Sequence, residues 1–146
     1  MAEHEGFTVV RADLDSGERF QTLRRELGVE SFGINILRLG PGQRGRIHRH
    51  ERQEEVYFVL AGELTLVVEG EETTLGTNAL ARVAPEVRRQ LLNRGPEPLR
   101  LLALGGDGEH AGRDGVAYGS WDDPPDAGRP PQEIPLPEDL RLPAPG

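Results

Sequence analysis

The segment HRHERQEEVYFVLAGE, residues 48–63, carries the pattern that decides the fold of this chain. His48 and His50 are separated by one residue, and on an extended strand they point to the same face because side chains alternate. Glu55 then opens an apolar run that ends at Leu60. Two imidazoles and one carboxylate on converging strands predict a metal-binding face with open positions for water or substrate.

The composition of the 146-residue chain narrows the classes of protein to which it can belong. Its mass of 16.0 kDa suits one domain with an appended tail. Cysteine is absent, so neither a disulfide framework nor a thiolate zinc site is available. No basic stripe stands out, which argues against nucleic acid as a partner. The acidic N-terminus leads into no long apolar run, so we expect a cytoplasmic protein with no membrane partner.

The central residues 31–105 read as a series of short strands separated by turns rich in glycine and proline. The predicted strands are 31–39, 44–50, 55–60, 63–69, 72–75, 79–84, 88–94 and 99–105. Short strands at close spacing are typical of an antiparallel sandwich or barrel, whereas a parallel sheet would need helical crossovers between its strands.

Residues 1–30 form a separate N-terminal segment in which a short amphipathic helix is predicted over 15–28. Asp15 or Ser16 can cap the start of this helix, and Gly28 suits the position that follows its end.

Residues 106–146 form an acidic C-terminal extension. Residues 107–146 carry a net charge of −6 out of the −8 of the whole chain, and eight of the twelve prolines lie in 124–145. Proline cannot donate the hydrogen bonds of a strand ladder, so we expect an extended tail. Its apolar residues allow it to lie along its own barrel or along a partner subunit, and Trp121 is expected to anchor it by packing.

The spacing of residues 42–62 resembles the first motif of the cupin family. Gly42 is followed by five residues and then by His48 and His50, and Glu55 and Gly62 follow at the spacing of the family. The chain is therefore similar to small single-domain cupins of the cupin-2 conserved-barrel type. The resemblance covers about residues 31–105. It implies an all-β fold, a double-stranded β-helix or jelly-roll barrel, here with a short N-terminal helix and an extended proline-rich tail.

The second cupin motif matches residues 78–93 with one large departure. Asn93 holds the final position of the motif, Pro85 lies in its turn, and Asn78 can replace a glycine because Asn tolerates a left-handed conformation. Arg89 stands where the family has its third histidine ligand. A guanidinium offers donors and no lone pair, so Arg89 cannot replace that ligand.

The resemblance implies a divalent metal, Fe, Mn, Ni or Zn, held by His48, His50 and Glu55. Three accounts of the site stay open at this point. The three residues hold a metal with waters completing its coordination, or Arg89 binds a small anion in a metal-free cavity, or the histidines are only structural. Tyr57 shares the face of Glu55 and Asn93 shares the face of Arg89, so both are candidate ligand-binding residues.

Two classes of function follow from these accounts. The first is a metal-dependent enzyme, a dioxygenase-like protein that acts on a small organic molecule. The alternative is a non-catalytic or metal-free cupin that binds a small anion through Arg89. Metal-independent isomerase chemistry, with a histidine base and Tyr57 as acid, is a third class. A homodimer is expected from the family and from the sheet edges that must be covered.

The alternation of side chains along a strand also predicts which other residues point inward or outward. Asn35 and Leu37 form an inward set on the early strand, and Gln90 faces away from the side of Arg89. Gln53 and Glu54 are expected to point outward at a solvated edge.

Overall fold

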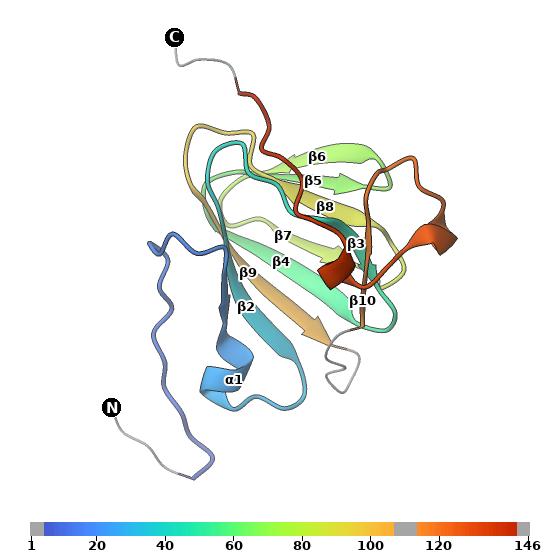
Figure 1. Cartoon of the computed structure of the whole chain (residues 1–146). Coiled ribbons are helices and arrows are strands. Elements are labelled where there is room, and N and C mark those ends of the chain that lie inside the picture. The colour runs from blue at the N-terminus through green and yellow to red at the C-terminus, as the bar shows by residue number, and fades with distance from the viewer. Residues whose placement is uncertain (1–4, 107–113, 143–146) are drawn as a thin grey trace.

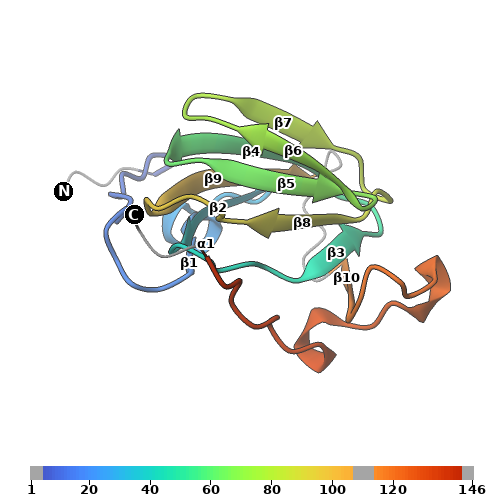
Figure 2. The same ribbon diagram turned by 90° about the horizontal axis from the view of Figure 1, so that it is seen from above.

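The computed structural model describes residues 5–106 and 114–142. There the chain forms two five-stranded antiparallel sheets that enclose one core (Figures 1 and 2). The first sheet, in the order β1-β2-β9-β4-β7, consists of Phe20–Thr22, Gly33–Leu39, Leu99–Gly106, Glu54–Ala61 and Leu80–Val83. The second, in the order β10-β3-β8-β5-β6, consists of Gly115–Tyr118, Ile47–His50, Arg89–Leu92, Leu64–Val68 and Glu71–Leu75. The predicted all-β jelly-roll architecture is confirmed.

The core lies between the inner faces of the two sheets and is mostly aliphatic. Alternation along β9 buries Leu99 and Leu101 completely and leaves Arg100 between them half-buried. Leu64 and Leu66 of β5 and Leu91 of β8 meet these side chains from the second sheet. Burial of such side chains contributes roughly 1.5–3 kcal/mol each, so this contact between the sheets holds the barrel together.

The N-terminal helix is much shorter than the sequence predicts. Helix α1 spans only Leu23–Leu27, and the prediction of a helix over 15–28 is wrong for its first part. Gly28 does end the helix in the left-handed conformation, at φ 78°, as expected. Among the described residues, no helix has the length and apolar content that a membrane crossing requires.

Backbone pairing explains why the residues before α1 are not helical. Oδ1 of Asp13 accepts the backbone N–H groups of Asp15 and Ser16, so these residues form a turn and do not cap a helix. Strand β1 pairs with β2, which commits the backbone of Phe20–Thr22 to a sheet ladder. The guanidinium of Arg38 donates to carbonyl oxygens of Asp13 and Glu18 and holds the segment against the sheet.

Two turn residues adopt a left-handed backbone conformation that their residue types tolerate. Gly62 has φ +83°, and a Cβ atom there would lie 2.5 Å from the carbonyl oxygen of Pro98. Only glycine fits this turn, which leads from β4 into β5. Asn78 has φ 75°, so it does replace a glycine in a left-handed turn before β7.

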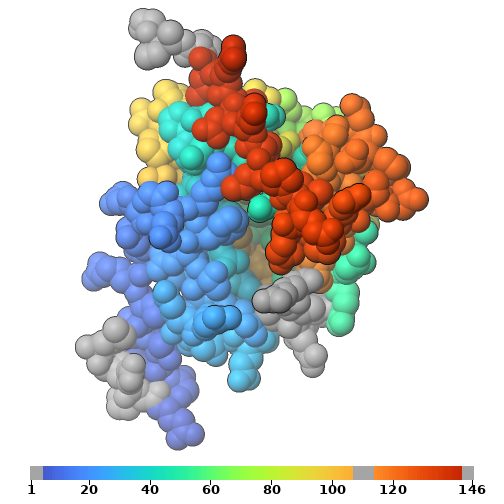
Figure 3. All heavy atoms as spheres, viewed as in Figure 1, coloured from blue at the N-terminus to red at the C-terminus, as the bar shows by residue number. Residues whose placement is uncertain are grey.

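The C-terminal extension packs on its own barrel. Residues Gly115–Tyr118 form strand β10, which sequence analysis missed, and β10 pairs with β3. Farther along, the N–H of Leu140 donates to the carbonyl oxygen of Gly42 over 2.7 Å. Figure 3 shows the extension lying across this face of the molecule near the N-terminal segment.

Trp121 and Gln90 tie the first part of the extension to the outer face of the second sheet. Nε1 of Trp121 donates to Oε1 of Gln90 over 3.0 Å. Gln90 also donates to the carbonyl oxygen of Gly45, so its side chain points away from the barrel interior as predicted. The anchoring role expected for Trp121 agrees with this contact.

Candidate metal centre

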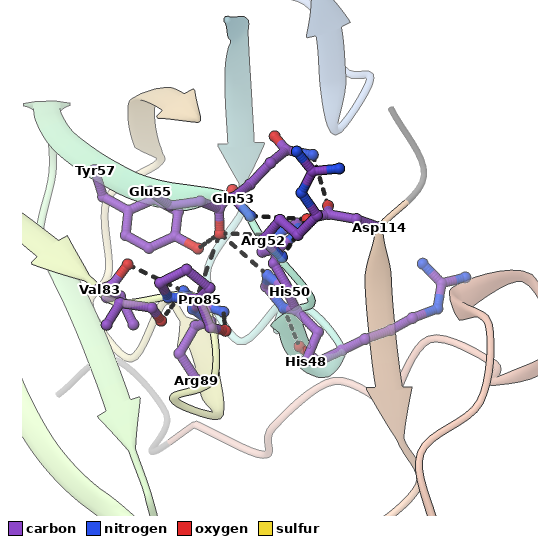
Figure 4. Close-up of polar contacts among 12 residues, drawn as sticks. His48, His50, Arg52, Gln53, Glu55, Tyr57, Val83, Pro85, Arg89 and Asp114 are labelled. Atoms are coloured by element: carbon purple, nitrogen blue, oxygen red, sulfur yellow. Dashed lines mark hydrogen bonds and ion pairs between the residues drawn. The ribbon is translucent and has the colours of Figure 1, made fainter. Parts of the chain in front are cut away.

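Three strands from both sheets bring the predicted ligands together. His48 and His50 project from β3, and Glu55 and Tyr57 project from the start of β4 (Figure 4). Arg89 opens β8 and is paired with His48 across the antiparallel ladder. The period of two within each strand turns all five side chains toward one region of the barrel.

The three candidate ligands are close enough to share one ion. Nε2 of His50 lies 3.1 Å from Oε1 of Glu55, and Nε2 of His48 lies 3.4 Å from the same oxygen. One ligand atom from each residue falls within 4.8 Å of the others. Two ligands at right angles and about 2.1 Å from a metal are about 3.0 Å apart, so the observed spacing suits coordination.

Each imidazole has its Nδ1 atom held by an acceptor outside this triad. Nδ1 of His50 lies 2.8 Å from Oδ1 of Asp114, and Nδ1 of His48 lies 3.2 Å from the carbonyl oxygen of Arg46. Because both acceptors lack a proton to give, each Nδ1 must carry the proton. The Nε2 atoms that face Glu55 then offer lone pairs whenever the rings are neutral, which is the form that binds metal.

A buried nitrogen atom without a hydrogen-bond partner also indicates that these side chains can hold a metal ion. Nε2 of His50 is buried and makes no hydrogen bond within the described residues, although Oε1 of Glu55 is near it. A buried nitrogen normally has a hydrogen-bond partner or a ligand. The donor set of two imidazole nitrogens and a carboxylate is chemically suited to Fe, Mn, Ni or Zn.

Arg89 does not turn into the cavity. Its side chain is fully buried, and its terminal nitrogens donate to the carbonyl oxygens of residues 83, 84 and 85 over 3.1–3.4 Å. Its Nε atom lies 3.9 Å from Oε1 of Glu55 and has no hydrogen-bond partner among the described residues. The guanidinium therefore leaves space beside Glu55 but keeps a positive charge close to it, and no face of Arg89 is open to a ligand.

Tyr57 and Asn93, the other two candidate ligand-binding residues, are both engaged within the protein. The hydroxyl of Tyr57 donates to Oε1 of Glu55 over 2.6 Å, which fixes the carboxylate. The amide of Asn93 is fully buried and donates to the carbonyl oxygens of Leu39 and Glu97. Tyr57 thus stays next to the candidate metal ligands, whereas Asn93 holds a loop together away from them.

Burial and charge act in opposite directions on the ionisable groups. Burial favours the neutral form of Glu55, but the adjacent imidazoles of His48 and His50 outweigh it and hold the Glu55 pKa well below 4.5. Burial disfavours the cation of His50, but Glu55 and Asp114 raise its pKa above 6.5. Burial, and then the charge of Glu55, raise the pKa of Tyr57 well above 10.0. When His50 is protonated, it forms an ion pair with Glu55.

Comparison with known proteins places the barrel in a family. Residues 35–105, which include the whole candidate site except Asp114, match the family model described as the Cupin domain. The barrel is a cupin domain. No curated protein gives a significant match to the chain.

Solved structures agree with this assignment of the fold. A cupin protein from Bacteroides fragilis superposes with a TM-score of 0.64 at 22% identity and covers 73% of this chain and 89% of its own. A protein from Thermus thermophilus gives a TM-score of 0.56 at 25% identity, covering 66% and 90%. A sugar phosphate isomerase of the cupin superfamily from Silicibacter pomeroyi gives 0.58 at 28% identity, covering 68% and 64%. This chain spans less than two thirds of the length of that isomerase.

A cavity of about 290 Å³ opens from the candidate metal ligands of the cupin barrel toward its surface. Its inner part contains His48, His50, Glu55 and Tyr57. The rest of its lining is Arg19, Phe20, Asn35, Leu37, Leu39, Gly45, Arg46, Leu91, Ala103, Gly115, Pro131 and Leu136. The inward orientation predicted for Asn35 and Leu37 is confirmed, and Arg89 and Asn93 are absent from this lining.

Asp114 is the residue of the site that sequence reasoning missed. It accepts the Nδ1–H of His50, and its other oxygen accepts the backbone N–H groups of Arg52 and Gln53. Gln53 itself donates to Asp114 over 2.6 Å and is only 6% exposed, so the prediction that it points into solvent is wrong. Glu54 is exposed and pairs with Arg82, in agreement with its prediction. Asp114 lies 64 residues after His50, and no local pattern marks it.

Proposed function

We propose that this cupin binds a divalent metal through His48, His50 and Glu55 and acts on a small organic molecule in the adjoining cavity, as a dioxygenase-like enzyme. The observation that carries the proposal is the orientation of the imidazoles. Both Nδ1 atoms are occupied by outside acceptors, so both Nε2 lone pairs are directed at the side of Glu55. Three protein ligands leave coordination positions for a small molecule.

The surrounding residues would position these ligands and keep water away from them. Asp114 would orient the ring of His50, as carboxylates next to metal-bound histidines do. Tyr57 would hold the carboxylate of Glu55 in one rotamer through its hydroxyl. Leucine side chains of the cavity would exclude solvent and strengthen electrostatic interactions inside it. A bound metal would supply Lewis acidity toward a small molecule in the cavity.

A matched pair of glutamate variants tests the metal site. Wild-type protein, Glu55→Gln and Glu54→Gln are freed of metal with a chelator, and Mn²⁺, Fe²⁺, Ni²⁺ and Zn²⁺ are titrated by calorimetry. We expect one ion per chain for the wild type and for Glu54→Gln, whose changed residue has an exposed side chain beside the site. Binding should weaken at least a hundredfold in Glu55→Gln. Equal affinities of the two variants, or no binding by the wild type, contradict the proposal.

A metal-free binding module is the second candidate, and the position of Arg89 favours it. A buried guanidinium whose Nε atom lies 3.9 Å from Glu55 supplies positive charge where a metal would otherwise do so. In this alternative, Arg89 and protonated His50 neutralise Glu55, and the cavity binds its ligand without catalysis. The same titrations separate the two candidates, because the module takes up none of the four metals at the site.

Isomerisation of a sugar phosphate is the activity named for the Silicibacter pomeroyi structure. Four of the sixteen residues that line the cavity are leucines, and they offer no partners to the hydroxyl groups of such a substrate. A polyol buried against apolar side chains would leave hydroxyl groups without hydrogen-bond partners. Tyr57 would also be a weak acid for this chemistry, since its hydroxyl is already donated to Glu55.

A further inference from the structure

The lining of the cavity contains charged residues of both signs. The inner end of the cavity holds the carboxylate of Glu55 together with His48 and His50, and the lining also includes Arg19 and Arg46. Two exposed side chains, Phe20 and Leu136, form part of the same lining and mark its outer end.

Arg46 keeps an uncompensated charge in this lining. It lies two residues before His48, on the same face of the chain, and its Nε atom donates to the carbonyl oxygen of Ile134 over 2.6 Å. A carbonyl is neutral, and no acidic side chain of residues 5–106 and 114–142 forms an ion pair with Arg46. The two terminal nitrogens of Arg46 are donors that a planar anion can bridge.

Arg19 adds a second cation to the same region. One of its nitrogens donates to the carbonyl oxygen of Arg44 over 2.8 Å. Another lies 3.8 Å from Asp139, whose side chain is 60% exposed. An ion pair at this distance with an exposed carboxylate is weak, so Asp139 neutralises the charge of Arg19 only in part.

Four leucines form an apolar part of the cavity wall. Leu37 and Leu39 of β2, Leu91 of β8 and Leu136 of the C-terminal extension contribute aliphatic surface to it. At roughly 30 Å³ for a water-sized group, a cavity of about 290 Å³ holds about ten non-hydrogen atoms. A ligand that fits is small, has one charged end, and is mostly hydrocarbon.

We propose that the cavity takes a small monocarboxylate with an apolar body, whose carboxylate is bound by Arg46 with support from Arg19. The body then lies along the leucines and its far end reaches His48, His50 and Glu55. The assignment of that far end as the reacting end rests on the proposed function. Arg19 and Arg46 are the cationic lining residues outside the candidate metal ligands, so the charged end of the ligand lies at these arginines.

Phenylacetate and phenylacetamide provide a matched pair of probes, because they have the same size and differ in charge. Their affinities are measured by calorimetry on chelator-treated protein for the wild type, Arg46→Gln and Arg44→Gln. Arg44 is the control, since its Nε atom donates to the carbonyl oxygen of Glu138 just as Arg46 donates to Ile134, yet Arg44 does not line this cavity.

We expect the wild type to bind phenylacetate at least tenfold more tightly than phenylacetamide. Arg44→Gln should keep this preference and Arg46→Gln should lose it. The wild-type preference should also shrink as the NaCl concentration rises, which tests the charge without any variant. Equal affinity for the two probes, binding of neither probe, or equal losses in the two arginine variants would overturn the inference.

A parallel Mn²⁺ titration separates this inference from the proposed function. Charge-selective binding that depends on Arg46, in a protein that takes up no Mn²⁺, removes the metal site and leaves the inference standing. Uptake of Mn²⁺ at Glu55 without any preference for phenylacetate removes the inference alone.

Discussion

Oε1 of Glu55 is the atom around which the ionisable groups of this cupin are arranged. Two imidazole nitrogens and the hydroxyl of Tyr57 lie within 3.4 Å of it, and Nε of Arg89 lies 3.9 Å away. Hydrogen bonds to an ionised carboxylate stabilise its charged form. The arrangement therefore keeps Glu55 ionised, so that its carboxylate can bind a cation. The nearby positive charge of Arg89 weakens that binding.

Replacement of Arg89 by histidine should strengthen metal binding and weaken the metal-free fold. The variant restores the third imidazole of the cupin motif and removes one positive charge from the site. It also removes the hydrogen bonds that the buried guanidinium donates to the carbonyl oxygens of residues 83–85, so its free energy of unfolding should fall by about 3 kcal/mol.

Thermal melts with and without Zn²⁺ measure both effects of Arg89→His. The rise in Tm on adding Zn²⁺ should exceed that of the wild type, while Arg88→His, changed at the neighbouring position that pairs with Glu69, should respond as the wild type does. An equal rise in all three proteins would contradict the prediction.

Asp114→Asn should reduce metal affinity by about tenfold or more, because the carboxylate that orients His50 is lost. Calorimetric titration with Mn²⁺ measures the change. Asp126→Asn removes an exposed acid from the same C-terminal extension and serves as the control. If both variants keep the wild-type affinity, Asp114 has no orienting role.

Among the elements of the fold, the C-terminal extension contributes both a strand and part of the cavity lining. Strand β10 supplies the sheet edge next to β3, and Asp114 stands just before it. Farther on, Pro131 and Leu136 line the cavity beside the candidate metal ligands. The extension thus joins the cupin barrel on two sides of the same site.

Gly42→Ala should loosen the extension selectively. Gly42 has φ +82°, and a Cβ atom there would lie 2.8 Å from the carbonyl oxygen of Leu140. Gly70→Ala is the control, because Gly70 has φ +85° and no atom would lie within 4 Å of its Cβ. Both variants should lose about 1–2 kcal/mol of unfolding free energy through backbone strain.

The additional clash in Gly42→Ala should appear at the amide of Leu140, which donates to the carbonyl oxygen of Gly42. Hydrogen exchange followed by NMR should be at least tenfold faster at this amide in Gly42→Ala than in Gly70→Ala. Identical exchange rates would show that the extension does not depend on this contact.

The stability of the whole metal-free molecule should depend on pH through its buried ion pair. The pKa of His50 is raised above 6.5, so its contribution is complete below 6.5 and is lost as pH rises through the folded-state pKa. The pKa values of Glu55 and Asp114 are lowered from 4.5 and 3.8, so their contributions are present above those values and are lost as pH falls through the folded-state pKa values.

Chelator-treated protein should therefore be most stable between about pH 4.5 and 6.5. Urea denaturation at a series of pH values measures the profile, and His50→Gln should flatten its alkaline side. A stability that increases steadily from pH 6 to 8.5 in metal-free wild type would be inconsistent with this ion pair.

We also propose that the molecule is a homodimer that covers an edge of its first sheet. Strand β7 is an edge strand, and its Leu80 is 63% exposed. Light scattering should give twice the chain mass of 16.0 kDa, and Leu80→Glu should restore the monomer. A wild-type mass of 16.0 kDa at high protein concentration would rule the dimer out.

Short-range chemistry made most of the barrel predictable. Alternation along β9 and the turn residues at Gly62 and Asn78 act over a few positions, so strand positions and turns could be read directly. Alternation along the strand also predicted that His48 and His50 lie on one face. The helix predicted over 15–28 failed in its first part because strand pairing with β2 outweighed its helical pattern.

The direction of Arg89 and the partner of His50 depend on contacts between distant segments. A long arginine side chain reaches several acceptors from one backbone position, and the carbonyl groups of residues 83–85 determine which ones it meets. Asp114 reaches His50 across 64 residues through the pairing of β10 with β3.

The amino-acid sequence alone thus specified the cupin barrel and its three candidate ligands, because the alternation of side chains and the chemistry of turns are local. Folding in three dimensions turned Arg89 away from the cavity, supplied Asp114 and laid the extension beside the site, because those outcomes depend on long-range packing.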